Sequence, residues 1–235
     1  MPSQIQAGEI IITLLYEDTD LLVVDKPAGL VVHPAYKHPD GTLFDAVRDY
    51  LYKRGEARPC LLHRLDKDTS GALILTKTDQ ARQRLVRALE QRTLTKQYLG
   101  LVCGHPVPAV GQIRARLRRD PADRLRTHIH PLGDESLTRY HTLRVFASGF
   151  SLLALQPITG RTHQLRIHLA ALGTPLVGDH VYGEPTRWAP LHPSRHLLHA
   201  HLLAFQHPTT NERLTITAPL PADVEEALEA CTALE

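Results

Sequence analysis

Short apolar runs rich in β-branched residues dominate the sequence, and they do not alternate regularly with helical patterns. Residues 10–24 have the pattern of a strand, a turn and a second strand. Thr138–Phe146 and Phe150–Gln156 have the pattern of a hairpin joined around residues 147–149. Further strands are predicted at residues 72–76, 96–104, 196–208 and 213–219. Strands in this irregular order indicate an α+β fold with a mainly antiparallel, mixed sheet and flanking helices.

Helix signals separate some of these strands. Thr42 and Thr78 are candidate N-caps of the first two helices. The segment TGRTHQLRIHLAALG has the pattern of a third helix, with Gly173 at its C-terminal cap. A fourth helix is expected after Pro221. The second helix has an arginine-rich face, formed by Arg82, Arg84 and Arg87.

The size and composition of the chain suit a folded protein. It has 235 residues, of which 43% are hydrophobic and 22% charged, and this excludes intrinsic disorder. The length permits one large domain or two small ones. We expect a single domain over residues 1–235, and two lobes about a cleft are the alternative.

Cysteine usage and hydropathy indicate the compartment. Cys60, Cys103 and Cys231 are scattered and form no CxxC pair, which suggests a reducing compartment and disfavours a usual structural zinc site. The N-terminal residues lack the pattern of a secretory signal. No apolar run approaches the roughly 20 residues of a membrane span. We therefore expect a cytoplasmic protein.

Arginine is concentrated between residues 106 and 134, a stretch that is polar, broken by prolines and aperiodic. The net charge is only +2, so local charge matters more than the total. A run of six arginines could be a solvated loop or a contact surface for phosphate groups. Its members are Arg114, Arg116, Arg118, Arg119, Arg124 and Arg126.

Three polar stretches interrupt otherwise core-like sequence. They are Leu62–Gly71, Thr95–Tyr98 and Thr159–His168, and each begins or ends a predicted regular element. Functional side chains are commonly presented at such positions by a rigid frame. The stretches offer, in turn, a carboxylate, a phenol and a guanidinium.

The first stretch lies in LLHRLDKDTSGALILTKT, which closely resembles the signature of RluA-type RNA pseudouridine synthases. YEDTDLLVVDKPAGLVVHPA resembles the opening block of that family, KQYLGLV its tyrosine motif and GRTHQLRIHLAALGTPLVGDHVYG its arginine motif. LLHAHLLAFQHP resembles its closing strand. The five blocks keep the order of the family and span residues 15–208.

The resemblance implies the pseudouridine synthase catalytic fold, with an active-site cleft across the sheet. It implies Asp66 as the catalytic aspartate, Tyr98 as the active-site tyrosine and Arg166 as the arginine that pairs with the aspartate. Arg64 matches the arginine that helps fill the RNA stack when the target base leaves. The implied activity is the isomerisation of uridine to pseudouridine in structured RNA.

The residue types suit this reaction. The N1–C1′ bond breaks, the uracil turns and C5 joins C1′, so no metal, nucleotide or redox cofactor is expected. Asp66 could trap an oxocarbenium-like sugar or remove a C2′ proton, and the sequence leaves both routes open. A carboxylate in a dry pocket needs a cation to stay ionised, and Arg166 supplies one that cannot lose its proton. Tyr98 offers a ring to stack on uracil and a hydroxyl that could accept the C5 proton.

The substrate must also be held while the target base is flipped, at a cost of a few kcal/mol. Arg64 could occupy the vacated space. We expect phosphate contacts from the arginine run, with Arg114, Arg116, Arg118 and Arg119 as the candidate residues, and from the basic face of the second helix.

Two other functions compete with this interpretation. A metal-dependent RNA hydrolase would use the histidines, but His163 with His168 and His199 with His201 have no strong ligand spacing. Activity in EDTA would exclude it. A non-catalytic RNA-binding factor on the same scaffold would be expected to have lost the aspartate or the tyrosine, and both are present.

The choice of RNA stays open at this point. The first family block begins by about residue 15, so we expect no N-terminal S4 domain. That favours the shorter family members that act on tRNA, on large-subunit rRNA or on both, whereas HRLDKDTSG is closer to the rRNA branch. We expect a monomer with no obligatory protein partner.

Overall fold

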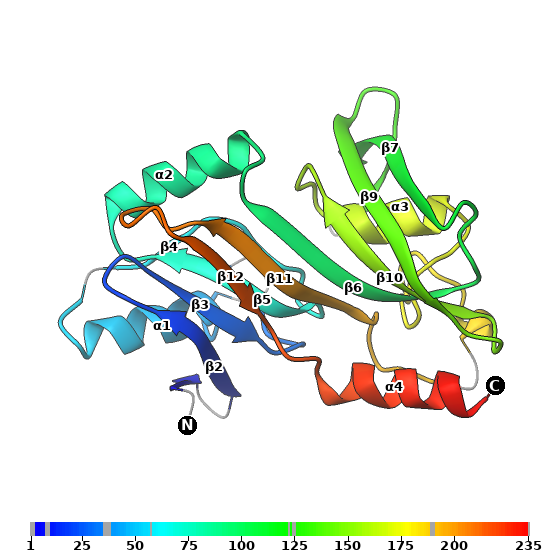
Figure 1. Ribbon diagram of the computed structural model, residues 1–235, viewed down its shortest axis with the longest axis horizontal. Helices are drawn as coiled ribbons and strands as arrows, with labels where there is room; N and C mark the ends of the chain where they lie inside the picture. Colours follow the sequence, from blue (N-terminus) through cyan, green and yellow to red (C-terminus); the bar gives the residue numbers. More distant parts are fainter. Residues whose placement is uncertain are drawn as a thin grey trace. The chain divides into compact units, whose positions relative to one another are not determined.

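The computed structural model describes residues 3–7, 10–34, 39–56, 58–121, 123, 126–188 and 191–234. The chain clusters into two compact units. The first unit comprises Met1–Lys96 and Ala200–Pro219, and the second comprises Gln97–His199 and Leu220–Glu235. Figure 1 shows the helices and strands of both. The α+β class predicted from the sequence is confirmed.

The first unit is built on a mainly antiparallel sheet. Its strand order is β1-β2-β3-β5-β11, with β12 paired to β11 and β4 to β5. The strands are β1 (Gln4–Ala7), β2 (Ile10–Glu17), β3 (Leu21–Lys26), β4 (Cys60–Leu61), β5 (Ser70–Thr76), β11 (Leu198–Gln206) and β12 (Arg213–Thr217). Every residue of β5 is buried, so this strand is the centre of the unit.

Two capped helices belong to this unit, α1 (Leu43–Tyr52) and α2 (Asp79–Glu90). The Thr42 hydroxyl accepts the backbone N–H of Asp45, and the Asp45 carboxylate accepts the backbone N–H of Thr42, which completes a capping box. The Thr78 hydroxyl accepts the N–H of Ala81. Both predicted N-caps are confirmed.

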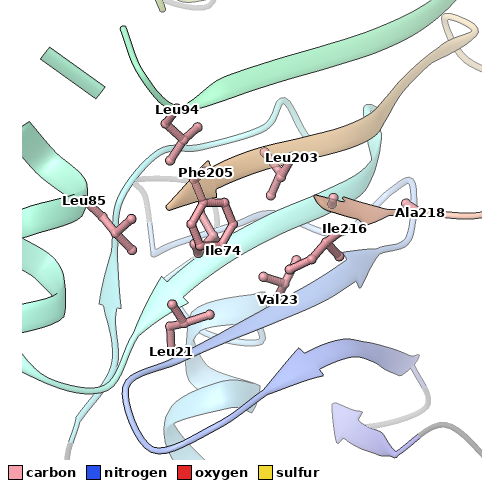
Figure 2. Packing of buried hydrophobic residues seen from close by; sticks show 10 residues of the cluster. Leu21, Val23, Ile74, Leu85, Leu94, Leu203, Phe205, Ile216 and Ala218 are labelled. Carbon is pink, nitrogen blue, oxygen red and sulfur yellow. The ribbon is translucent and has the colours of Figure 1, made fainter. Parts of the chain in front are cut away.

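The core of the first unit lies between α2 and the sheet. Figure 2 shows Leu85 of α2 beside side chains from β3, β5, β11 and β12. Burying such apolar side chains supplies most of the stabilisation of a sheet packed under a helix. The buried members are Leu21, Val23, Ala72, Ile74, Leu85, Leu94, Leu203, Phe205, Ile216 and Ala218.

The second unit has its own antiparallel strands, in the order β6-β10-β9-β7-β8. They are β6 (Thr95–Cys103), β7 (Val110–Arg119), β8 (Thr127–Ile129), β9 (Asp134–Val145) and β10 (Phe150–Pro157). The helices are α3 (Gln164–Ala171), the short 3₁₀ turn η1 (Pro185–Arg187) and α4 (Ala222–Ala233). Phe146, Phe150 and Trp188 pack with Val224 and Cys231 of α4 in its core.

The structure differs from the sequence patterns at two places in the second unit. The aperiodic stretch between residues 106 and 134 contains β7 and β8, so the solvated loop that was one alternative for the arginine run is not observed for Arg114–Arg119. The sequence pattern of β7 is weak because arginines occupy its outward positions and only one of its residues, Leu117, is fully buried. The third helix begins at Gln164 and not at Thr159, because the Gln164 side chain accepts the Thr159 hydroxyl and the Arg161 N–H and holds TGRTH as a loop. The helix stop is as expected, with Gly173 at a φ of +82°.

Candidate active site

Asp66 lies in the first unit, on the loop that joins β4 to β5. Its backbone carbonyl accepts the N–H of Thr69 at 3.2 Å, which closes a turn over Lys67 and Asp68. Asp66 is half-buried, and Thr69 and Ser70 after it are buried. The loop therefore runs directly into the fully buried strand β5.

A buried lysine fixes the other side of this loop. Lys26 at the end of β3 is 0% exposed. Its ammonium donates to the backbone carbonyls of Pro27, Leu30 and Lys67, each at 2.8 Å. The Gly29 N–H also donates to the Lys67 carbonyl, at 3.0 Å. A buried ammonium is costly without hydrogen bonds, and here each of its three donors has an acceptor.

Gly71 sets where β5 begins. Its φ is +111°, and a Cβ at this position would lie 2.3 Å from the carbonyl oxygen of Ala200. Only glycine meets both conditions. The TSG of the sequence signature thus has a steric reason, which is the close approach of β11 to β5.

His63 and Arg64, the first two residues of HRLD, differ in exposure. Arg64 is exposed. Burial, together with the charge of Lys96, lowers the pKa of His63 to about 3. His63 is therefore neutral near pH 7.

Tyr98 and Arg166 lie in the second unit. Tyr98 is on β6, where it faces Leu155 of β10, and is 8% exposed. Arg166 is on α3 and is buried. The proximity of Asp66 to these two residues stays a prediction.

The structure joins Arg166 to a carboxylate that the sequence analysis did not single out. Arg166 Nε is 2.7 Å from Asp179 Oδ2, and Arg166 Nη2 is 2.7 Å from Asp179 Oδ1. The side chain of Asp179 is 1% exposed. Burial alone would raise the pKa of Asp179, but the hydrogen bonds and charge of Arg166 and the backbone N–H groups of Tyr182 and Val181 outweigh it, and the pKa is lowered.

Tyr182 is a second neighbour of Arg166 that was missed. The Arg166 Cζ atom lies 5.1 Å from the centroid of the Tyr182 ring, in cation–π range. The Tyr182 hydroxyl accepts the backbone N–H of Thr127 at 3.0 Å and lies 2.9 Å from His163 Nδ1. Tyr182 and Asp179 both belong to GDHVYG, so the signal was present in the arginine motif. Their burial and pairing depend on the fold, and spacing does not reveal them.

His196 is a buried histidine near Arg166. Burial, with the nearby charge of Arg166, lowers the pKa of His196 to about 3. The ring is therefore neutral near pH 7. His196 therefore adds no positive charge beside the Arg166 guanidinium, which pairs with Asp179.

The arginine run divides between the two faces of β7. Arg114, Arg116 and Arg118 are exposed and alternate with half-buried or buried residues, so they share the outward face of the sheet. Arg116 pairs there with Glu135 of β9 at 3.0 Å. Arg119 breaks the alternation, and its Nη2 atom donates to the Thr162 hydroxyl of the loop before α3 at 3.4 Å. Arg124 lies outside the described residues.

A pocket of about 430 Å³ lies at the end of β7. Arg118, Arg119 and Arg161 line it together with Thr162 and Asp134. Arg161 Nη1 is 3.6 Å from an Asp134 carboxylate oxygen. Three guanidinium groups against one carboxylate give the pocket a positive balance. In the first unit, Arg82, Arg84 and Arg87 of α2 are exposed, and Arg84 donates to the Pro208 carbonyl.

Two of the four histidines considered for a metal site, His163 and His168, make hydrogen bonds to hydroxyl groups. His163 contacts the Tyr182 hydroxyl, and the buried His168 lies between the Ser136 and Thr138 hydroxyls at 2.8 and 2.9 Å. Within the described part of the chain, the group with metal-ligand geometry is Asp18, Asp20 and His207. His207 Nε2 lies 2.7 Å from Asp18 Oδ2, and the Asp20 carboxylate accepts the hydroxyls of Thr78 and Thr209.

Comparison with known proteins defines the class. The family model described as RNA pseudouridylate synthase matches residues 20–171. The chain belongs to this family, whose members are isomerases that act on RNA. No helix in the described residues is long and apolar enough to cross a bilayer.

Individual relatives agree with the family. A protein of Chloroflexus aurantiacus named uncharacterized RNA pseudouridine synthase is 48% identical over 86% of this chain, and the match spans 63% of that relative. Ribosomal large subunit pseudouridine synthase D of Salmonella typhimurium is 37% identical, over 97% of this chain and 73% of the relative. Among solved structures, human RNA pseudouridylate synthase domain containing 4 has a TM-score of 0.75 at 25% identity, over 93% of this chain and 92% of that one.

Proposed function

We propose that this chain converts a uridine of structured RNA to pseudouridine, with Asp66 as the carboxylate that acts at ribose C1′ or C2′. The observation that carries the proposal is the position of Asp66. It follows HRL in the family signature, on a loop fixed by the buried Lys26 ammonium and by the steric limit at Gly71. Catalytic groups need such fixed placement, because misplacement by 1 Å can cost about 10²-fold in rate.

The chemistry balances without an outside reactant. In one route Asp66 bonds to C1′ as the N1–C1′ bond breaks. The turned uracil then forms the C5–C1′ bond and releases the carboxylate. In the other route Asp66 removes a C2′ proton and later returns it. In both, C5 loses a proton and N1 gains one, and Tyr98 is our candidate for a group that stacks on the uracil or accepts the C5 proton.

Arg166 is proposed to keep Asp66 ionised. A carboxylate in a dehydrated site would otherwise take up a proton. The guanidinium remains charged at any pH at which the enzyme works, and its fork of donors can serve more than one carboxylate. Asp179 accepts hydrogen bonds from Nε and Nη2 on one edge of the Arg166 guanidinium. The N–H bonds on the other edges point away from Asp179.

RNA contacts are proposed on two surfaces. Arg64, exposed beside Asp66, would fill the space of the flipped base. Arg114, Arg116 and Arg118 on the outward face of β7, with the pocket at Arg119, would bind backbone phosphates. We also propose that the enzyme is monomeric and acts in the cytoplasm, where its three cysteines would stay reduced.

Large-subunit rRNA is the proposed substrate class, because a relative whose match covers 97% of this chain carries that substrate in its name. Purified protein should be incubated in EDTA with large-subunit rRNA transcripts and, separately, with a tRNA pool, followed by mapping of pseudouridine. We expect product at defined rRNA positions, with Asp66→Ala as the blank. Product in tRNA alone would overturn the substrate assignment, and RNA cleavage that requires added metal, without pseudouridine, would favour the hydrolase alternative.

A further inference from the structure

The contact between Arg166 and Asp179 has a geometry that fixes orientation as well as charge. Two parallel N–H···O bonds of 2.7 Å hold one edge of the planar guanidinium. Side-on pairs of this kind define both the position and the plane of the arginine group. The remaining N–H bonds therefore point in set directions away from Asp179.

Asp179 is itself held by its own turn. Its Oδ1 atom accepts the backbone N–H groups of Val181 and Tyr182 at 3.0 and 3.1 Å. The preceding Gly178 has a φ of +77°, and a Cβ there would overlap the carbonyl oxygen of Arg195. The Asp179 carboxylate, which orients Arg166, is therefore itself held in a fixed position.

Tyr182 links the same arginine to the start of α3. Its ring lies under the guanidinium, and its hydroxyl bonds the backbone of β8 at Thr127. The same hydroxyl contacts His163, the N-cap residue of α3, which has a left-handed φ of +55°. A non-glycine residue in that conformation costs about 1–2 kcal/mol, so a partner that stabilises it is expected.

Stability alone is a weak explanation for this arrangement. A buried ion pair is often no more stabilising than apolar residues of the same size, because both charges lose their hydration. Apolar residues in place of Arg166 and Asp179 could therefore be as stable as the ion pair. Only the ion pair presents guanidinium N–H bonds in fixed directions, which suits a reaction.

We propose that Asp179 and Tyr182 are positioning residues that orient the Arg166 guanidinium for the isomerisation. The inference rests on the proposed function, in which Arg166 serves Asp66. Neither residue need touch the substrate. Both act through the arginine.

The test compares single-turnover pseudouridine formation, RNA affinity and urea stability for Asp179→Asn, Arg166→Gln and the double variant. We expect Asp179→Asn to lower the single-turnover rate about 10²-fold, with RNA affinity within about twofold. Each single change breaks the buried ion pair from one side, so the double variant should be more stable than either. Its rate should nevertheless stay as low as that of Arg166→Gln.

The outcomes separate the possible roles. If the double variant regains the wild-type rate along with its stability, the pair is structural and the inference is overturned. A wild-type rate for Asp179→Asn would overturn it as well. Failure of the proposed function would be detected by a different variant, because Asp66→Asn would then still form product.

Tyr182 is tested with a matched control. Tyr182→Phe keeps the ring over Arg166 and removes the hydroxyl, and we expect the rate to fall about 5- to 10-fold. Tyr140→Phe removes another largely buried hydroxyl of the second unit, which bonds the Pro108 carbonyl at 3.0 Å. It should leave the rate unchanged at a similar loss of stability. Equal rates for the two variants would remove Tyr182 from the proposal.

Discussion

At the scale of single residues, the Asp66 loop depends on one buried cation. Lys26 satisfies the carbonyl groups of three residues, two just after β3 and the third, Lys67, next to Asp66. No neutral side chain could donate to all three. The lysine of the opening motif is therefore a brace for the loop that carries the candidate carboxylate.

Removal of this brace should be costly. We expect Lys26→Met to lower the free energy of unfolding by about 2–4 kcal/mol, because buried carbonyl groups lose their donor. Urea denaturation measures the loss. Lys53→Met, at an exposed position, should change stability by less than about 0.5 kcal/mol. Similar values for the two variants would show that Lys26 is not a brace.

Sequence could predict some functional residues and not others. Asp66, Tyr98 and Arg166 come from motifs whose letters and order are visible in the chain, and their roles stay predictions. Asp179 is also visible in GDHVYG, but carboxylates near glycine are common in turns. Only its 1% exposure and its two hydrogen bonds with Arg166 distinguish it, and these depend on tertiary structure.

At the scale of elements, β7 shows why an arginine-rich strand is hard to predict. The exposed Arg114, Arg116 and Arg118 alternate with Ala115 and Leu117, but Arg119 departs from the pattern. With one large buried side chain in ten residues, the period of two is weak. Pairing with β9 over eight residues supplies what the sequence of β7 lacks. The capped helices α1 and α2 were predictable because their signals are local.

The arrangement of β7 makes its arginines testable as RNA-binding residues. For Arg118→Glu combined with Arg119→Glu, we expect RNA affinity to fall and the slope of log affinity against log salt to decrease by about 2, because two phosphates would no longer be neutralised. Filter binding over a salt series measures both. Arg213→Glu on β12, an exposed arginine of the first unit, is the control. An unchanged slope in the double variant would mean that these arginines are merely solvated.

At the scale of the whole molecule, buried histidines make stability depend on pH. Burial lowers the pKa of His168 to about 4, and the pKa values of His63 and His196 are about 3. In the unfolded chain each would titrate near 6.5. Below that pH the unfolded chain binds protons that the folded protein does not, so stability falls. Burial raises the pKa of Asp25 to about 6. Between about pH 6 and 4 the folded protein therefore binds a proton at Asp25 that the unfolded chain does not bind, and this offsets the proton excess of one histidine.

We therefore expect the free energy of unfolding to decrease between pH 6.5 and about 4, with a slope that corresponds to an excess of about two protons near pH 5. Urea denaturation at closely spaced pH values measures this slope. His168→Gln should reduce the excess by about one proton. Stability that is flat between pH 7 and 5 would contradict the account of these histidines.

The fold class was predictable because strand patterns outnumber helical ones in an irregular order, and the family because five motifs keep their order. The boundary between the two compact units was not predictable. β6 and β11 each pass from one unit to the other, so no linker or change of composition marks the boundary.

Pseudouridine formation by Asp66→Asn, measured under single turnover on an RNA that the unchanged enzyme modifies, tests the central claim most directly. RNA affinity should be measured in parallel. The substitution keeps the size of the side chain and removes its charge. We expect affinity within about twofold of the unchanged enzyme and no pseudouridine above the level without enzyme. Product formed at an undiminished rate would show that the Asp66 carboxylate does not carry the reaction.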